Sequence, residues 1–311
     1  MKDWKWLALP VSIAICVAAI TLAPKYQASD AVAVLWIEIA ALAVLMIAVG
    51  SSVTTRFWGI LINERNVMSL TRFQAVLWTV LVLADFATVL LIRAYHGLPA
   101  TAVQIQPELL ALMGISYASA VGTTIVNANK SGMQTPDGAL DSTKANLGED
   151  AASAASQGVL YKNKNISDAQ ISDMFQGDEL ADTHMIDLGK VQMFFFTIVS
   201  AVVFIGLAKG ALTGVDAGAL TNGTLPIDKL IPTLPQTLIA LMGISHGAYL
   251  GNKAVTRTQP QPPVEAQPQP QPQLQPPQPQ PQPPQPQPQP VNPLLLTDND
   301  DKKVSPDIKK P

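Results

Sequence analysis

The hexapeptide Ala-Leu-Met-Gly-Ile-Ser occupies residues 111–116 and recurs unchanged at residues 240–245, each time inside a long apolar stretch. Upstream of each copy, Arg72-Phe-Gln and Lys190-Val-Gln are both followed, after four intervening residues, by a threonine at the head of another apolar stretch. Small residues also align between the copies, namely Gly114, Ala118 and Gly122 in the first and Gly243, Gly247 and Gly251 in the second. The spacing predicts a duplicated unit of two membrane helices.

The composition indicates an integral membrane protein. Of the 311 residues, 48% are hydrophobic and 14% are charged, which is little charge for a soluble domain. A helix needs ~20 mostly apolar residues to cross a bilayer, and the apolar runs are continuous rather than alternating, so an all-α protein is expected. Six segments qualify: residues 6–23, 31–50, 73–92, 107–126, 191–209 and 234–250. The single cysteine, Cys16, excludes a disulfide framework and a cysteine-based metal site.

The basic residues predict the orientation, because cytoplasmic loops carry an excess of Lys and Arg. One side of the six spans is flanked by Lys2, Lys5, Arg56, Arg65, Arg72, Lys130, Lys190, Lys253 and Arg257. The other side has Lys25, Arg93, Lys209 and Lys229. Both termini and the middle loop are therefore expected in the cytoplasm. The apolar core of segment 6–23 is longer than that of a signal peptide, so we interpret it as an uncleaved span.

Six regions follow from these spans. They are an N-terminal transmembrane hairpin (1–50), a cytoplasmic interfacial segment (51–72), a first repeat unit (73–130), a cytoplasmic insert (131–189), a second repeat unit (190–257) and a tail (258–311). Both repeat units enter from the cytoplasm and return to it, so the repeat is parallel. Apolar residues beside Arg56 and Arg65 predict an interfacial helix in the second region. In the insert, the first half reads as flexible, whereas Ser-Asp-Ala-Gln at 167–170 predicts a short helix that docks on the bundle.

The tail is a low-complexity spacer with a different peptide at its tip. Residues 259–290 are almost wholly Pro and Gln and hold 15 of the 26 prolines, so they cannot bury a core. Such a disordered, extended spacer reaches ~100 Å at ~3.1 Å per residue. The residues beyond it that we expect to dock a partner are Leu294, Leu295, Leu296, Asp298, Asp300 and Asp301. A tail without any partner is the alternative.

Small residues four apart lie on one helical face and allow close helix approach. The six small residues shared by the two copies are therefore predicted to pack span four against span six. A permeation path along the same seam is the alternative.

Acidic residues inside a membrane are candidates for function, because an unpaired charge there is costly. Glu38 and Asp85 fall at comparable depth in spans two and three, and His246 lies in span six. Together they could form a proton or cation site. The alternative is a hydrogen-bonded pair that only fixes helix packing, and it is favoured by the absence of an acid at Val203, the position equivalent to Asp85.

Two polar pairs open the cytoplasmic ends of spans three and five, Gln74 with Thr79 and Gln192 with Thr197. A symmetric polar mouth is one interpretation of them. Hydrogen bonds between helices, each contributing ~0.6 kcal/mol, are the other.

Residues 243–247 match the Gly-x-Ser-x-Gly pattern of a nucleophile elbow, but that elbow needs a strand-to-helix turn and the match lies in an apolar helix. Six spans with Ser116 in span four and His246 in span six are also similar to the layout of rhomboid intramembrane serine proteases. The short first outer loop and the lack of a His-Asn pair in span two depart from that family. No catalytic residue, cofactor motif or metal site is predicted.

The segments Arg72-Phe-Gln-Ala-Val-Leu-Trp-Thr79, Asp187-Leu-Gly-Lys-Val-Gln-Met-Phe-Phe-Phe-Thr197 and Ala240-Leu-Met-Gly-Ile-Ser-His-Gly-Ala-Tyr-Leu-Gly-Asn-Lys253 resemble a group of uncharacterised bacterial multi-pass membrane proteins. The resemblance covers roughly residues 56–255. It implies an address in the bacterial inner membrane and attaches no activity.

The leading hypothesis is a non-enzymatic anchor or scaffold, in which the tail or the 131–189 insert binds a cytoplasmic protein. The rival is an oligomeric channel or carrier for protons or small cations that uses Glu38 and Asp85. The bilayer is the one partner common to both, and nucleic acid is not expected.

Overall fold

The computed structural model describes residues 31–99, 103–213, 215 and 230–258, with Pro10 and Ile13 of the N-terminal segment. Five long helices dominate it: α2 (Ala31–Thr54), α3 (Leu70–Tyr95), α4 (Pro107–Ser131), α6 (Leu188–Leu212) and α8 (Gln236–Ala254). Four of them, α2, α3, α4 and α6, are long and apolar enough to cross a membrane. The predicted span 234–250 forms α8, which is not among these four, and the predicted span 6–23 lies outside the described residues apart from Pro10 and Ile13.

The helices extend beyond the predicted apolar windows because polar residues cap them. Ser69 Oγ accepts a hydrogen bond from the Arg72 amide at the start of α3. Asp187 Oδ1 accepts from the Gly189 and Lys190 amides at the start of α6. In α4, Pro107 occupies the first turn, where its missing N–H leaves no hydrogen bond unmade.

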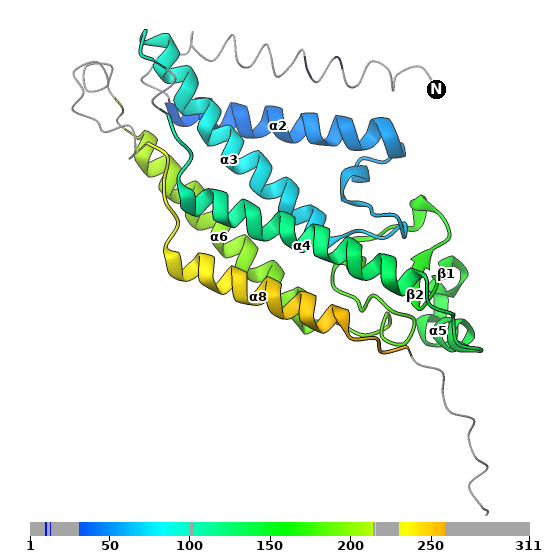
Figure 1. Cartoon of the computed structure of the whole chain (residues 1–311). Coiled ribbons are helices and arrows are strands. Elements are labelled where there is room, and N and C mark those ends of the chain that lie inside the picture. Colours follow the sequence, from blue (N-terminus) through cyan, green and yellow to red (C-terminus); the bar gives the residue numbers. More distant parts are fainter. Residues whose placement is uncertain are drawn as a thin grey trace, which may run out of the picture. The chain divides into compact units, whose positions relative to one another are not determined.

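Four helices form a closed ring of neighbours. α3 packs on α4, α4 on α8, α8 on α6 and α6 on α3, while α2 packs on α3 and also touches α6 (Figure 1). The main apolar core lies inside this ring, where the Trp78 and Phe204 rings meet edge to face at 6.2 Å. Helices α3 and α6 begin at the same end of the bundle at which α4 and α8 finish. We call it the "insert end", because residues 131–189 lie there (Figure 1).

The first half of the insert is folded, so the prediction of a flexible segment is wrong. It contains α5 (Ala139–Leu147), the 3₁₀ helix η5 (Gly148–Ser153) and an antiparallel hairpin of β1 (Ala154–Gln157) with β2 (Leu160–Asn163). Gly158 turns the hairpin with a φ of +63°, and a Cβ there would lie 2.3 Å from the Lys130 carbonyl oxygen. The hairpin turn therefore lies in direct contact with the last turn of α4. Only glycine fits at this position of the turn.

The second half of the insert does dock on the bundle, but through 3₁₀ turns rather than an α-helix. These are η6 (Ile166–Asp168) and η7 (Ile171–Met174), each closed by a capping box. Met174 is buried in an apolar cluster with Met193 of α6 and Tyr249 of α8. The predicted interfacial helix is likewise reduced to η3 (Gly59–Leu61), whose successor Ile62 pairs with Met68 in an isolated β-bridge.

Candidate functional site

The insert end holds a buried ionic cluster built around two adjacent carboxylates, Asp178 and Glu179. Asp178 Oδ1 lies 2.5 Å from Arg65 Nη2, and its Oδ2 lies 3.2 Å from Lys190 Nζ and also contacts Lys253 Nζ. Glu179 Oε1 lies 2.5 Å from Lys130 Nζ. We call these residues, which are Arg65, Lys130, Asp178, Glu179, Lys190 and Lys253, the ionic cluster.

The four cations come from four different segments. Arg65 lies in the loop before α3, Lys130 in the last turn of α4, Lys190 in the first turn of α6 and Lys253 in the last turn of α8. Lys130 Nζ also donates to the Val255 carbonyl oxygen at 2.8 Å. Basic side chains at helix C-termini suit the free carbonyl groups there. One acidic pair from the insert thus ties together the ends of three bundle helices and the loop before the fourth.

The surroundings of the two acids keep them charged. Burial alone would raise the pKa of Asp178, but Lys190, Lys253 and Arg65 outweigh it and hold the pKa well below its usual value. Burial would also raise the pKa of Glu179, and the Lys130 ammonium with the Thr258 and Arg257 amides lowers it. A buried charge is tolerated when it is paired and hydrogen-bonded in this way.

Glu179 also binds the backbone at the start of the tail. Glu179 Oε2 accepts hydrogen bonds from the Arg257 amide at 2.9 Å and the Thr258 amide at 2.6 Å. Thr258 Oγ1 in turn accepts from the Ala181 amide at 3.1 Å, and Arg257 forms an ion pair with Asp182. The residue that precedes the Pro/Gln segment is therefore fixed to the insert.

The middle of the bundle has the opposite character. Asp85 is 0% and Glu38 is 2% exposed, and neither Asp85 oxygen nor Glu38 Oε1 has a hydrogen-bond partner within the described part of the chain. Glu38 lies 16 residues before the end of α2 and Asp85 lies 15 residues after the start of α3, so both are ~22–24 Å from the insert end. The two helices pack on each other, which places both acids in neighbouring helices at similar depth.

His246 is buried in α8, and neither ring nitrogen has a partner among the described residues. No hydrogen bond joins it to Ser116, whose Oγ also has no partner in the described structure. Nothing in this arrangement resembles a nucleophile and its base, which must be within hydrogen-bond reach.

The buried face of α4 carries a polar stripe that the sequence analysis missed. Its members are Ser116, Ser119, Thr123, Asn127 and Lys130, all buried. Steps of three and four residues put them on one helical face, and this spacing is visible in the sequence. The stripe leads along the bundle interior toward the ionic cluster, and Ser116 Oγ and Ser119 Oγ have no partner in the described residues.

The four predicted mouth residues do not converge. Gln74 Nε2 donates to Thr197 Oγ1 at 2.6 Å, joining α3 to α6 in the interior. Thr79 instead shares a hydrogen bond with Tyr117 of α4 at 2.8 Å, and Gln192 is exposed. Gln74 and Thr197 thus connect two neighbouring helices through a side-chain hydrogen bond.

Helices α4 and α8 pack on each other, but mainly not through the aligned small residues. Gly122 meets Leu250, and Gly243 meets Ile115. Gly114, Ala118, Gly247 and Gly251 are exposed in the single chain. The predicted docking residues from Leu294 to Asp301 lie outside the described residues.

Known proteins offer no further guide to this site. No protein-family model, no curated protein and no solved structure matches the chain. The ionic cluster and the unpartnered acids are therefore the features that bear on its function.

Proposed function

We propose that the protein is a non-enzymatic anchor of the bacterial inner membrane that presents its Pro/Gln tail to a cytoplasmic protein. The proposal takes the insert end as the cytoplasmic side, with six spans and a parallel repeat of two helix pairs. The observation that carries it is the attachment of Thr258 to Glu179. A spacer is useful for presentation when its base is held, because a fixed base limits the volume that its tip explores.

The ionic cluster supports this function because it makes the base of the tail part of the bundle. Glu179 binds Lys130 of α4 through one oxygen and the chain at Arg257 and Thr258 through the other. The neighbouring Asp178 binds Lys190 and Lys253. The spacer would therefore start from a fixed base at Thr258, with Leu294–Leu296 and the acidic tip as the peptide that a partner recognises.

The test is a pull-down from native lipid with three forms of the protein: the full chain, a chain ending at Thr258, and a full chain with Leu294, Leu295 and Leu296 changed to Ala. A cytoplasmic protein recovered with the full chain and lost from both altered forms supports the proposal. A matched control carries Val291→Ala and Asn292→Ala, which lie beside the leucines in the tail. Identical recovery from all forms would overturn it.

A second candidate function is a pathway for protons or small cations. The specific observation in its favour is Asp85, a fully buried acid with both oxygens unpartnered in the described chain. Proton or cation flux into liposomes that Asp85→Asn abolishes would favour this function, and well-folded protein without flux would exclude it. The arrangement of Ser116 and His246 favours neither and gives an intramembrane protease no support.

A further inference from the structure

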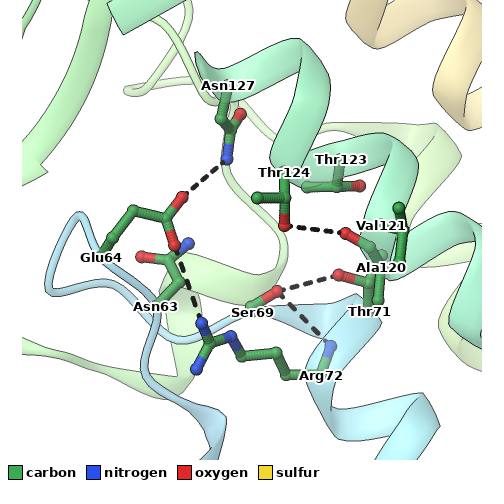
Figure 2. Close-up of a pocket in the computed structure, with 10 residues that line it drawn as sticks. All are labelled: Asn63, Glu64, Ser69, Thr71, Arg72, Ala120, Val121, Thr123, Thr124 and Asn127. Atoms are coloured by element: carbon green, nitrogen blue, oxygen red, sulfur yellow. Dashed lines mark hydrogen bonds and ion pairs between the residues drawn. The ribbon is translucent and has the colours of Figure 1, made fainter.

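A polar pocket of about 220 Å³ opens between the loop before α3, the first turn of α3 and α4 (Figure 2). It is separate from the ionic cluster and from the buried acids. Its polar lining includes Asn63, Glu64, Ser69, Arg72, Thr124 and Asn127. This space is far larger than one water molecule requires.

The rim of the pocket carries one charge of each sign. Arg72 Nη2 and Glu64 Oε2 are 3.7 Å apart, and each side chain is 44% exposed. The pair is longer than a hydrogen bond, so both groups keep capacity for a ligand. Arg72 Nη1 donates to the Ile62 carbonyl oxygen at 2.8 Å, which fixes the guanidinium at the rim. A ligand that carries both a cation and an anion matches this pair.

Asn127 of α4 lines the pocket, and its amide nitrogen points toward Glu64 (Figure 2). It is only 4% exposed, and its Nδ2 donates to Glu64 Oε1 at 3.4 Å. Its Oδ1 is buried and has no donor within the described residues. Because Oδ1 is covered by protein atoms, a ligand in the pocket meets the Glu64 carboxylate rather than this oxygen. Glu64 favours a ligand cation that can donate hydrogen bonds.

The pocket also adjoins a surface that suits an acyl chain. Val121 lines it, and Tyr117, Val121 and Ile125 are exposed on α4, one of the four helices apolar enough to span a membrane. Two further exposed aromatic residues, Phe57 and Trp58, precede the pocket loop. Tryptophan and tyrosine are enriched where a membrane meets water. A polar pocket next to an apolar helix face is the geometry that a lipid requires.

We propose that this pocket binds the headgroup of a phospholipid that bears a primary amine, of the phosphatidylethanolamine class. Its ammonium group would donate to Glu64, and its phosphate would pair with Arg72. One acyl chain would follow Val121 along α4. A choline headgroup has no N–H to donate, and an anionic glycerol headgroup has no cation for Glu64, so both should bind more weakly. This site is independent of the anchor function and goes beyond it.

The experiment is native mass spectrometry of the delipidated full chain, titrated with phosphatidylethanolamine, phosphatidylcholine or phosphatidylglycerol of the same acyl chains. Soluble phosphoethanolamine is a fourth ligand that separates the headgroup from the lipid. The expected result is a preference of about tenfold for phosphatidylethanolamine over phosphatidylcholine, which corresponds to one charge-assisted hydrogen bond. Phosphoethanolamine should bind far more weakly than the lipid.

Two variants locate the site. Glu64→Gln should remove the preference between ethanolamine and choline lipids, and Arg72→Gln should weaken both. Glu108→Gln, in the first turn of α4 at the other end of that helix, is the matched control and should change neither. Because Glu64 and Arg72 are half-exposed, the variants should melt like the original protein without lipid. Equal binding of the three lipids, or a preference that survives Glu64→Gln, would overturn the proposal.

Discussion

Buried acids have different surroundings at the two levels of the bundle, namely the ionic cluster at the insert end and the middle of the helices. At the insert end, Asp178 and Glu179 are surrounded by four cations and by backbone amides. In the bundle, Asp85 has no partner for either oxygen among the described residues. The first arrangement makes the fold sensitive to the loss of any one member, because removing one member leaves others uncompensated. The second stabilises nothing that the described residues reveal, so a carboxyl there points to another role.

The largest effect should follow from Asp178→Asn. This change leaves Arg65, Lys190 and Lys253 without their common anion, and breaking a buried ion network typically costs about 3–5 kcal/mol. We expect a loss of about 3 kcal/mol in the free energy of unfolding in detergent, together with faster proteolysis of the insert. Asp141→Asn is the control, because Asp141 is 87% exposed and forms only a 3.8 Å pair with Lys144. Equal stability of the two variants would show that the cluster does not hold the insert.

A smaller effect should follow from Gly158→Ala, which tests the contact between the insert and α4. The new Cβ would meet the Lys130 carbonyl oxygen at 2.3 Å, in a residue whose φ is +63°. Strain and displacement together should cost about 2–3 kcal/mol. Gly97→Ala is the matched control, since its φ is +68° but nothing lies within 4 Å of the added atom. The control should lose only about 1–2 kcal/mol, and thermal unfolding of both variants measures the difference. If Gly97→Ala were the more harmful change, the hairpin would not press on α4.

Acid should weaken the insert end by a smaller, graded amount. The pKa of Asp178 in the folded protein lies well below its usual value of 3.8. As the pH falls, the unfolded chain therefore binds a proton on Asp178 at a higher pH than the folded chain does. The stabilisation is present in full above about pH 5 and is lost as the pH falls toward the folded-state pKa. The free energy of unfolding should therefore drop by up to about 1.4 kcal/mol per pH unit below pH 4 for this one proton. Titrated in the same detergent, Asp178→Asn should lack that part of the slope, and parallel curves for the two proteins would contradict the assignment.

Hydropathy predicts the long helices well and the insert poorly, for a physical reason. A membrane helix is specified by its own apolar residues, so α2, α3, α4 and α6 can be recognised locally. The first half of the insert has few apolar residues, and it is held by partners far away in the chain. Arg65 Nη1, for example, donates to the carbonyl oxygen of Tyr161 in β2 at 2.9 Å, although the two residues are 96 apart in sequence. Such a pair leaves no local pattern, whereas the three- and four-residue steps of the α4 polar stripe do.

The smallest effect on stability should come from Asp85→Asn. The contrast with Asp178→Asn tests whether the two buried acids differ in their structural role. Asparagine is nearly the same size as aspartate, and Asp85 has no cation beside it whose charge the change would leave uncompensated in the described structure. We therefore expect the free energy of unfolding to change by no more than about 1 kcal/mol, against about 3 kcal/mol for Asp178→Asn. Unfolding of the two variants in one detergent measures this difference.

A large loss of stability for Asp85→Asn would mean that the carboxyl group binds a partner outside the described residues and has a structural role. A small loss combined with altered flux in liposomes would assign Asp85 to transport, and a small loss without any flux would leave the acid to the packing of α2 on α3.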